Sequence, residues 1–200
     1  FARSVDGQQV WRYNGTPNNW TQIGGPSSRL IGSGSSALYS IYPPTGDIYQ
    51  YNGTPGSWTY IGPSRAEFVA NDSALYARSA GGAQVFKYSG TPGTWTVIGG
   101  ASNGLFAGGT ALFSIYPPTG DIYQFNPSTS VWSFLTGPGL RFAANRRGLY
   151  KQSSDGLEIF RLSGGTTTKV GGAGIVGFNA AADTFVTVHS SNDLLMLLNP

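Results

Sequence analysis

Apolar and aromatic residues recur along the chain in short runs that do not alternate cleanly with polar residues. Typical runs are LYSIY at 38–42 and QVFKY at 84–88. Runs of β-branched and aromatic residues between glycine, proline and serine are typical of β-strands. Strands whose sheet is covered on both faces need not alternate between apolar and polar positions. We therefore predict an all-β protein whose sheets pack through both faces.

A tryptophan motif gives these runs a fixed period. Trp20, Trp58, Trp95 and Trp132 lie 38, 37 and 37 residues apart, and each is followed by an apolar residue and glycine, as in WTQIGG. A weaker fifth copy is TTKVGG at 167–172. Each unit of about 37 residues also holds three further strand-like runs. Four short antiparallel strands per unit are the sequence signature of a β-propeller blade.

A longer period of two units overlies the first. The segment SIYPPTGDIYQ occupies 40–50 and returns unchanged at 114–124, where it would form the second and third strands of a blade. Residues 184–200 align without a gap on 111–127, so we expect the blade pair to occur three times. The predicted repeat units of this single propeller domain are 1–25, 26–62, 63–100, 101–137, 138–172 and 173–200.

The first and last of these units are expected to be incomplete. Continuing the period of the blade pair past the C-terminus, a closed ring of six blades would need about 24 more residues, one outermost and one innermost strand. The alternative is a ring of five blades, in which the strand near 175–179 completes the first blade. That alternative leaves 184–200 as a spare hairpin, so six blades are preferred.

Composition and charge exclude several classes of function. Only 10% of the residues are charged, the net charge is +3, and the lysines and arginines are scattered, which does not fit binding to nucleic acid. The chain has no cysteine, which excludes disulfides and thiolate metal sites. No apolar run is long enough to insert into a membrane, and no signal-peptide pattern opens the chain. We expect a soluble protein, with its compartment and any homo-oligomerisation left open.

Catalysis is not expected, because the residues that it requires are scarce. The chain has one histidine, His189, and nine carboxylates with no pair set apart by its context. Asp47 and Asp121 occupy identical contexts in different units, which favours a repeated role over joint action at one centre. No metal-ligand spacing is present, so we predict a protein that is not an enzyme and needs no metal and no cofactor.

Repeated polar and aromatic residues are the candidates for ligand binding. Aromatic faces stack on the apolar faces of sugars, while carboxylate, amide and guanidinium groups bind hydroxyl and acetamido groups. Each candidate also has a purely structural interpretation: core packing for the tyrosines, turn formation for the aspartates and asparagines, and simple solvation for the arginines. The tryptophans are assigned to packing between blades. The candidate sugar-binding residues are Arg29, Arg65, Arg141, Asn71, Asn145, Tyr39, Tyr76, Tyr150, Tyr42, Tyr116, Asp47 and Asp121.

The repeated units carry a resemblance to a known family. YNGTPNNWTQIGG, YNGTPGSWTYIG and YSGTPGTWTVIGG, together with ALYSIYPPTGDIYQ, resemble the repeats of tectonin-type β-propeller lectins of fungi over essentially the whole chain. The resemblance implies a six-bladed propeller that binds glycans with terminal N-acetylglucosamine in shallow pockets between blades, without catalysis or an obligatory metal.

The chain also departs from that pattern. Arg29, Arg65 and Arg141 are aligned at one register in the links between units, and Asn103 stands at that register instead of an arginine. The fifth unit has lost its tryptophan, and the sixth lacks the tyrosines and PPTGD. Fewer than six working pockets would follow. The alternative function is a non-catalytic propeller scaffold that binds other proteins.

Overall fold

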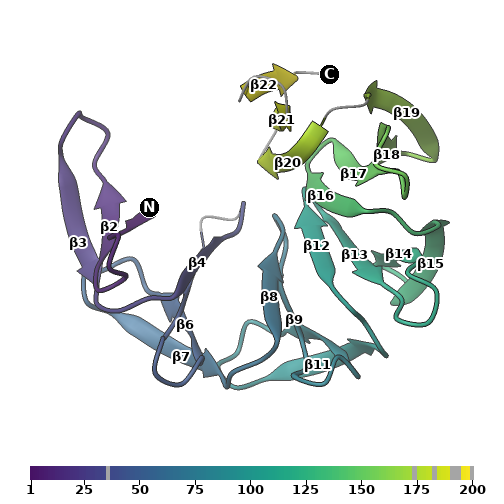
Figure 1. Ribbon diagram of the computed structural model, residues 1–200. Coiled ribbons are helices and arrows are strands. Elements are labelled where there is room, and N and C mark those ends of the chain that lie inside the picture. Colours follow the sequence, from purple (N-terminus) through teal and green to yellow (C-terminus); the bar gives the residue numbers. More distant parts are fainter. Residues whose placement is uncertain (35–36, 173–174, 182–183, 190–194, 199–200) are drawn as a thin grey trace. The chain divides into compact units, whose positions relative to one another are not determined.

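The computed structural model describes residues 1–34, 37–172, 175–181, 184–189 and 195–198. These residues form six antiparallel β-sheets and no helix (Figure 1). They divide into two compact units, residues 1–70 with 74–98 and residues 71–73 with 99–200. The prediction of an all-β protein is confirmed, and the number of sheets equals the number of predicted repeat units.

The first unit contains one three-stranded sheet and two four-stranded sheets, each with its strands in chain order. The first strand of each sheet lies beside the first strand of the next, β1 with β4 and β4 with β8. The strands of the three sheets are β1 (Ala2–Arg3), β2 (Val10–Tyr13), β3 (Trp20–Gly24); β4 (Arg29–Gly32), β5 (Leu38–Ile41), β6 (Ile48–Tyr51), β7 (Trp58–Gly62); and β8 (Glu67–Ala70), β9 (Leu75–Arg78), β10 (Val85–Tyr88), β11 (Trp95–Gly99).

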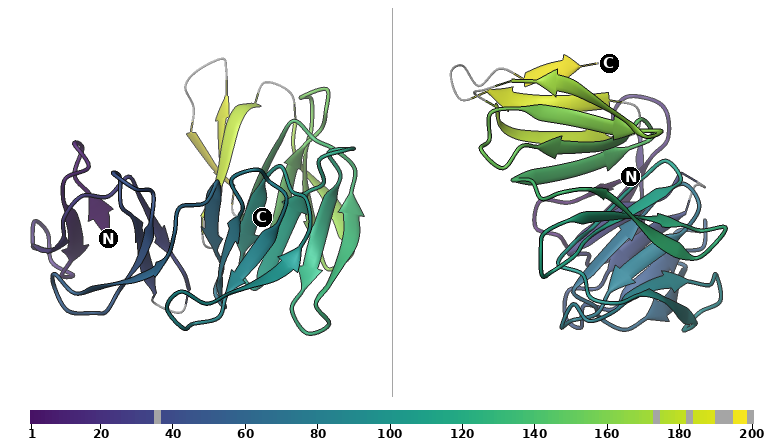
Figure 2. Two further views of the ribbon diagram at one scale, coloured as in Figure 1. Left: turned by 90° about the horizontal axis from the view of Figure 1, so that it is seen from below. Right: turned by 90° about the vertical axis from the view of Figure 1, so that its right-hand side faces the viewer.

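The second unit contains two four-stranded sheets and one three-stranded sheet. Strand β16 lies beside both β12 and β20, and Figure 2 shows the green sheet β16–β19 next to the yellow sheet β20–β22. The strands are β12 (Leu105–Gly108), β13 (Ala111–Ile115), β14 (Ile122–Asn126), β15 (Val131–Thr136); β16 (Arg141–Asn145), β17 (Gly148–Gln152), β18 (Ile159–Ser163), β19 (Thr166–Gly171); and β20 (Ile175–Ala181), β21 (Thr184–His189), β22 (Leu195–Leu198).

The eleven-residue repeat forms the second and third strands of two sheets, as predicted. Strands β5 and β6 come from its first copy and β13 and β14 from its second. The degenerate third copy gives β21 and β22, which pair in the same antiparallel way. Strand β20 pairs with β21, so this segment begins a sixth sheet, contrary to the five-blade alternative. Residues 190–194 and 199–200 of the predicted match lie outside the described residues.

A β-bulge in the last strand of a sheet explains the Trp-x-x-Ile-Gly motif. In β3, Ile23 is the extra residue between two ladder pairs, and its carbonyl is therefore free to leave the sheet. That carbonyl accepts hydrogen bonds from Trp58 Nε1 at 2.8 Å and from the backbone N–H of Gly56 at 2.9 Å, both in the next sheet. Trp95 Nε1 donates to the carbonyl of Ile61 at 2.9 Å in the same way. The predicted packing role of these two tryptophans is confirmed.

The glycine of this motif is required by the same contact. A Cβ at Gly24 would lie 2.9 Å from Trp58 Nε1, and one at Gly62 would lie 2.7 Å from Trp95 Nε1. Real Cβ atoms do not approach other atoms that closely, so the indole ring can pack here only against a glycine. The sequence therefore fixes how one sheet attaches to the next within this unit.

The core lies between the sheets and not within one layer. Leu38 packs with Val10 and Ile23 of the preceding sheet. Its neighbour Tyr39 packs with Phe68 of the following sheet. Successive residues of one strand point to opposite faces, and both faces of this sheet are covered. This is why the strand runs lack a clean apolar and polar alternation.

Candidate functional site

The predicted tyrosines of the second strands are buried. Tyr39, Tyr76 and Tyr150 expose 6%, 1% and 0% of their surface. Desolvation, and to a smaller extent the neighbouring Tyr88, raises the pKa of Tyr39 above its ordinary value. Rings at this depth contact a ligand only if the sheets separate. Their burial therefore assigns these three residues to packing.

The two predicted asparagines belong to the second unit, and each donates a hydrogen bond to a backbone carbonyl of that unit. Asn71 Nδ2 donates to the carbonyl of Ala111 at 3.2 Å, and Asn145 Nδ2 donates to the carbonyl of Thr184 at 2.9 Å. The Oδ1 atom of each accepts the backbone N–H two residues further on, which closes an Asx turn. Both side chains are buried, and their polar atoms serve the fold.

The two predicted aspartates belong to the turn between the second and third strands. Asp47 Oδ1 accepts the backbone N–H of Ser64 at 3.1 Å, in the link to the next sheet. Asp121 Oδ2 accepts the hydroxyl of Thr119 at 2.6 Å. These bonds give both carboxylates a structural role at the turn. The backbone carbonyl of each aspartate also accepts the N–H of a predicted tyrosine at 2.8 Å, Tyr42 for Asp47 and Tyr116 for Asp121.

The three predicted arginines do not share one register, which corrects the sequence alignment. Arg29 and Arg141 are the exposed first residues of β4 and β16, and the ladder gives Glu67 the same place in β8. Arg65 lies two residues earlier, in the link itself. Its guanidinium stacks over the ring of Phe86 at 3.8 Å, with the Trp95 ring centroid at 5.2 Å.

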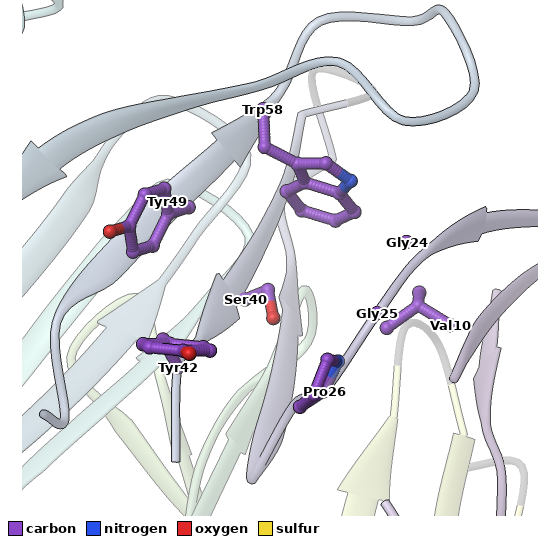
Figure 3. Close-up of a pocket in the computed structure, with 8 residues that line it drawn as sticks. All are labelled: Val10, Gly24, Gly25, Pro26, Ser40, Tyr42, Tyr49 and Trp58. Atoms are coloured by element: carbon purple, nitrogen blue, oxygen red, sulfur yellow. The ribbon is translucent and has the colours of Figure 1, made fainter. Parts of the chain in front are cut away.

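A pocket of about 270 Å³ opens between the first two sheets of the first unit (Figure 3). One wall is the link that follows β3, and the other is formed by aromatic side chains of sheet β4–β7. The residues that line the pocket are Val10, Gly24, Gly25, Pro26, Ser40, Tyr42, Tyr49 and Trp58. None of them is charged.

The strand register brings the aromatic side chains of this pocket together. Ser40 pairs with Tyr49 across the ladder, and Tyr51 pairs with Trp58, so these side chains share one face of the sheet. Tyr42 follows β5 directly and meets the Tyr49 ring edge-on, with centroids 6.2 Å apart and planes at 76°. The three aromatic residues that line the pocket, Tyr42, Tyr49 and Trp58, form its aromatic wall.

Few polar groups lie at the base of the pocket, and they form hydrogen bonds within the protein. The Ser40 hydroxyl donates to Ser27 Oγ at 2.9 Å, and Ser27 Oγ donates to the carbonyl of Arg29 at 3.1 Å. The Trp58 indole N–H is used by the bond to the preceding sheet. The pocket thus offers aromatic faces and neutral polar groups, a combination suited to an uncharged ligand with one apolar side.

Sheet β12–β15 of the second unit carries the same side chains in the same geometry. The Ser114 hydroxyl donates to Ser102 Oγ at 2.8 Å, as Ser40 does to Ser27. Tyr116 and Tyr123 meet edge-on with centroids 5.9 Å apart and planes at 71°. Trp132 lies against Phe125 at 5.1 Å, as Trp58 lies against Tyr51 at 5.0 Å. The aromatic wall is therefore repeated 74 residues further along the chain.

Sequence reasoning found only part of this wall. It selected Tyr42 and Tyr116 but left out Tyr49, Tyr123 and the tryptophans. The missing tyrosines are letters of the repeated segment SIYPPTGDIYQ, so the unchanged repeat was a usable signal. The tryptophans were assigned to packing alone, whereas Trp58 both joins two sheets and lines the pocket.

A second pocket of about 330 Å³ lies on sheet β12–β15 near Thr110, Gln124 and Asn126. Across the part of the chain that is described, no group of three histidine, cysteine or acidic residues is placed to hold a metal ion. The same residues contain no helix of the length and apolarity that crossing a membrane requires. A scan against protein-family models gave no match, and a search of curated proteins gave none either.

Proposed function

We propose that this protein is a multivalent, non-catalytic lectin that binds glycans ending in N-acetylglucosamine or a related N-acetylated sugar. The observation that carries the proposal is the open, uncharged aromatic pocket beside sheet β4–β7, together with the second copy of its aromatic wall on sheet β12–β15. The site residues of the proposal are Ser40, Tyr42, Tyr49 and Trp58 with their counterparts Ser114, Tyr116, Tyr123 and Trp132.

The chemistry of an N-acetylated sugar suits such a wall. The ring of a hexose has an apolar face of C–H groups that stacks on tyrosine or tryptophan, and its acetamido group is planar and stacks equally well. The hydroxyls then need neutral donors and acceptors at the rim, which tyrosine hydroxyls and backbone groups provide. A charged sugar would find no opposite charge among the eight lining residues.

Single sites of this kind bind weakly. Each hydrogen bond to a sugar hydroxyl replaces one to water and yields only about 0.5–1.5 kcal/mol. Single-site dissociation constants should therefore lie between millimolar and tens of micromolar. Two or more sites on one chain strengthen binding to a surface that displays many sugar ends, by roughly a hundredfold or more, through effective concentration.

The architecture we propose is a β-propeller in which the six sheets are the blades. The support is that each sheet follows chain order and that first strands of neighbouring sheets lie side by side within each unit. Four-stranded antiparallel sheets repeated around a centre are the blades of a β-propeller.

The test is a titration with N-acetylglucosamine followed by NMR of the five tryptophan indole N–H groups. We expect the signals of Trp58 and Trp132 to shift with millimolar or tighter affinity. Tyr49→Ala should silence only Trp58, and Tyr123→Ala only Trp132. Tyr13→Ala, which removes an exposed tyrosine outside the pocket, is the matched control.

A glycan array complements the titration, because it samples many sugars at once. If neither Trp58 nor Trp132 responds to N-acetylglucosamine and the array shows no bound glycan, the lectin proposal is rejected. The aromatic walls would then favour the scaffold function, with a protein partner on the exposed rings of Tyr60 and Phe134, which extend the two walls.

A further inference from the structure

The pocket beside sheet β4–β7 has a structural counterpart one sheet further on in the same unit. Ladder partners define the correspondence: Leu30, Ser40 and Tyr49 stand opposite one another in β4–β6, as Phe68, Ala77 and Phe86 do in β8–β10. Three residues before the first member of each row lies the link residue, Ser27 in one case and Arg65 in the other. Trp58 and Trp95 correspond through their identical bonds to the preceding sheet.

The counterpart groove is filled by the side chain of Arg65. Its guanidinium lies over Phe86 and faces Trp95, the counterparts of Tyr49 and Trp58. The Arg65 Nε atom is buried and has no hydrogen-bond partner among the described residues. Burial also lowers the pKa of Arg65 below its ordinary value. Aromatic faces, and not a carboxylate, therefore hold this cation.

The first groove remains open because its link residue is short. Ser27 is fully buried, and its hydroxyl accepts a hydrogen bond from Ser40, which lines the pocket. The two grooves also differ in having Ala77 in place of Ser40 and Ser79 in place of Tyr42, but the link side chain Arg65 is the one that lies over the aromatic rings. A planar guanidinium and a planar acetamido group both stack on an aromatic face.

We propose that Arg65 occupies a latent binding site and keeps it closed to ligand. The latent site lies between sheets β4–β7 and β8–β11, its aromatic wall is Phe86 and Trp95, and it takes the same N-acetylated sugar as the open pocket. This inference rests on the proposed function for the identity of the ligand. The occupation of the groove by Arg65 rests only on the contacts described here.

A second groove supports the view that the chain fills such spaces itself. In the second unit, Lys151 stands at the position of Ser40, and its Nζ donates to Thr136 Oγ1 at 3.1 Å and to the carbonyl of Gly137 at 2.9 Å. Burial lowers the pKa of Lys151, and the Asp121 carboxylate opposes this. The counterpart of Trp58 there is Thr167, so only Phe160, the counterpart of Tyr49, is left on that face.

The deciding experiment compares Arg65→Ser and Arg65→Ser/Ala77→Ser with the unaltered protein. The double variant recreates the pair of hydroxyls found at Ser27 and Ser40. In a titration with N-acetylglucosamine we expect the Trp95 indole signal, silent in the unaltered protein, to become responsive, and the number of sites per chain to rise by about one. Lys151→Ser opens a groove without a tryptophan and should add no site. Arg29→Ser removes an exposed arginine and should change nothing.

A second measurement needs no ligand. In the unaltered protein, ring currents from Phe86 and Trp95 should move the Arg65 side-chain proton signals upfield of those of Arg29. Ordinary shifts for Arg65 would show that the groove is not filled in solution and would overturn the proposal. A Trp95 signal that stays silent in both Arg65 variants while Trp58 responds would also overturn the proposal. Fewer binding sites in these variants than in the unaltered protein would overturn it too, because Arg65 would then itself contact the sugar. If Trp58 and Trp132 are themselves silent, the lectin proposal fails, and the ring-current measurement still decides the occupation by Arg65.

Discussion

The groove beside sheet β4–β7 is open, whereas the groove beside sheet β8–β11 holds a side chain of the protein itself. Both have the same frame: a tryptophan over a glycine, bonded to the bulged isoleucine of the sheet before, with Nε1 to oxygen distances of 2.8 and 2.9 Å. Their link residues differ, Ser27 in one and Arg65 in the other. A repeat protein can therefore keep the frame that joins its sheets while the space within that frame changes from pocket to packing.

Substitutions of the tryptophans that join the sheets should have the largest effects on stability. Trp58→Ala and Trp95→Ala each remove a half-buried ring and the bond across the groove, and we expect each to lower the free energy of unfolding by about 2–4 kcal/mol. Trp95→Ala should lower the free energy of unfolding further, by about 0.5–2 kcal/mol, because it also removes the cation–π contact with the Arg65 guanidinium. Urea unfolding measures both. Equal losses would mean that the contact between Arg65 and Trp95 contributes nothing.

The glycine under each tryptophan should come next. Gly24→Ala and Gly62→Ala place a Cβ inside the indole contact, so each should lower stability by about 1–3 kcal/mol in thermal or urea unfolding. Gly25→Ala is the matched control, because a Cβ there meets nothing within 4 Å. A destabilisation by Gly25→Ala as large as that by Gly24→Ala would contradict the role of the indole contact.

The stability contributed by the filled groove should depend on the volume of the side chain at position 65 more than on its charge. Arg65→Met keeps a long side chain between Phe86 and Trp95 but removes a half-buried cation that has no ion-pair partner among the described residues. We expect stability to change by less than about 1 kcal/mol, since the lost cation–π contact and the relieved desolvation cost oppose each other. Sugar titration should leave the Trp95 signal silent, unlike in Arg65→Ser. A loss above 2 kcal/mol would show that the charge itself stabilises the groove.

The smallest effect concerns Tyr88, whose hydroxyl is buried without a hydrogen-bond partner among the described residues. Burial raises the pKa of Tyr88, so above about pH 10 the unfolded chain loses this proton before the folded protein does. The unfolded state then binds fewer protons, and stability falls as pH rises. Tyr88→Phe should weaken that alkaline loss and be neutral or slightly stabilising at pH 7, as unfolding at pH 7 and pH 10.5 would show.

Much of the fold was predictable because its signals are local. The tryptophan spacing predicted the first four units, and the unchanged eleven residues predicted the paired second and third strands. Residues 184–189 and 195–198 form the two paired strands that their alignment predicted. The arginine register could have been taken from the same spacing, since Arg29 and Glu67 each lie nine residues after the preceding tryptophan, whereas Arg65 lies seven residues after Trp58. The ladder agrees that Glu67, and not Arg65, matches Arg29.

The sequence by itself determined the period, the strands and the tryptophan frame, because each depends on residues within one unit or its immediate neighbour. It did not determine which face of a strand borders a pocket. Both faces are covered by neighbouring sheets, and the sequence pattern does not distinguish adjacent residues such as Tyr39 and Ser40. Tertiary structure decided that Tyr39 enters the core and that Ser40 lies at the base of a pocket. It also decided that Arg65 fills the next groove, since that depends on how far a link side chain reaches across two packed sheets.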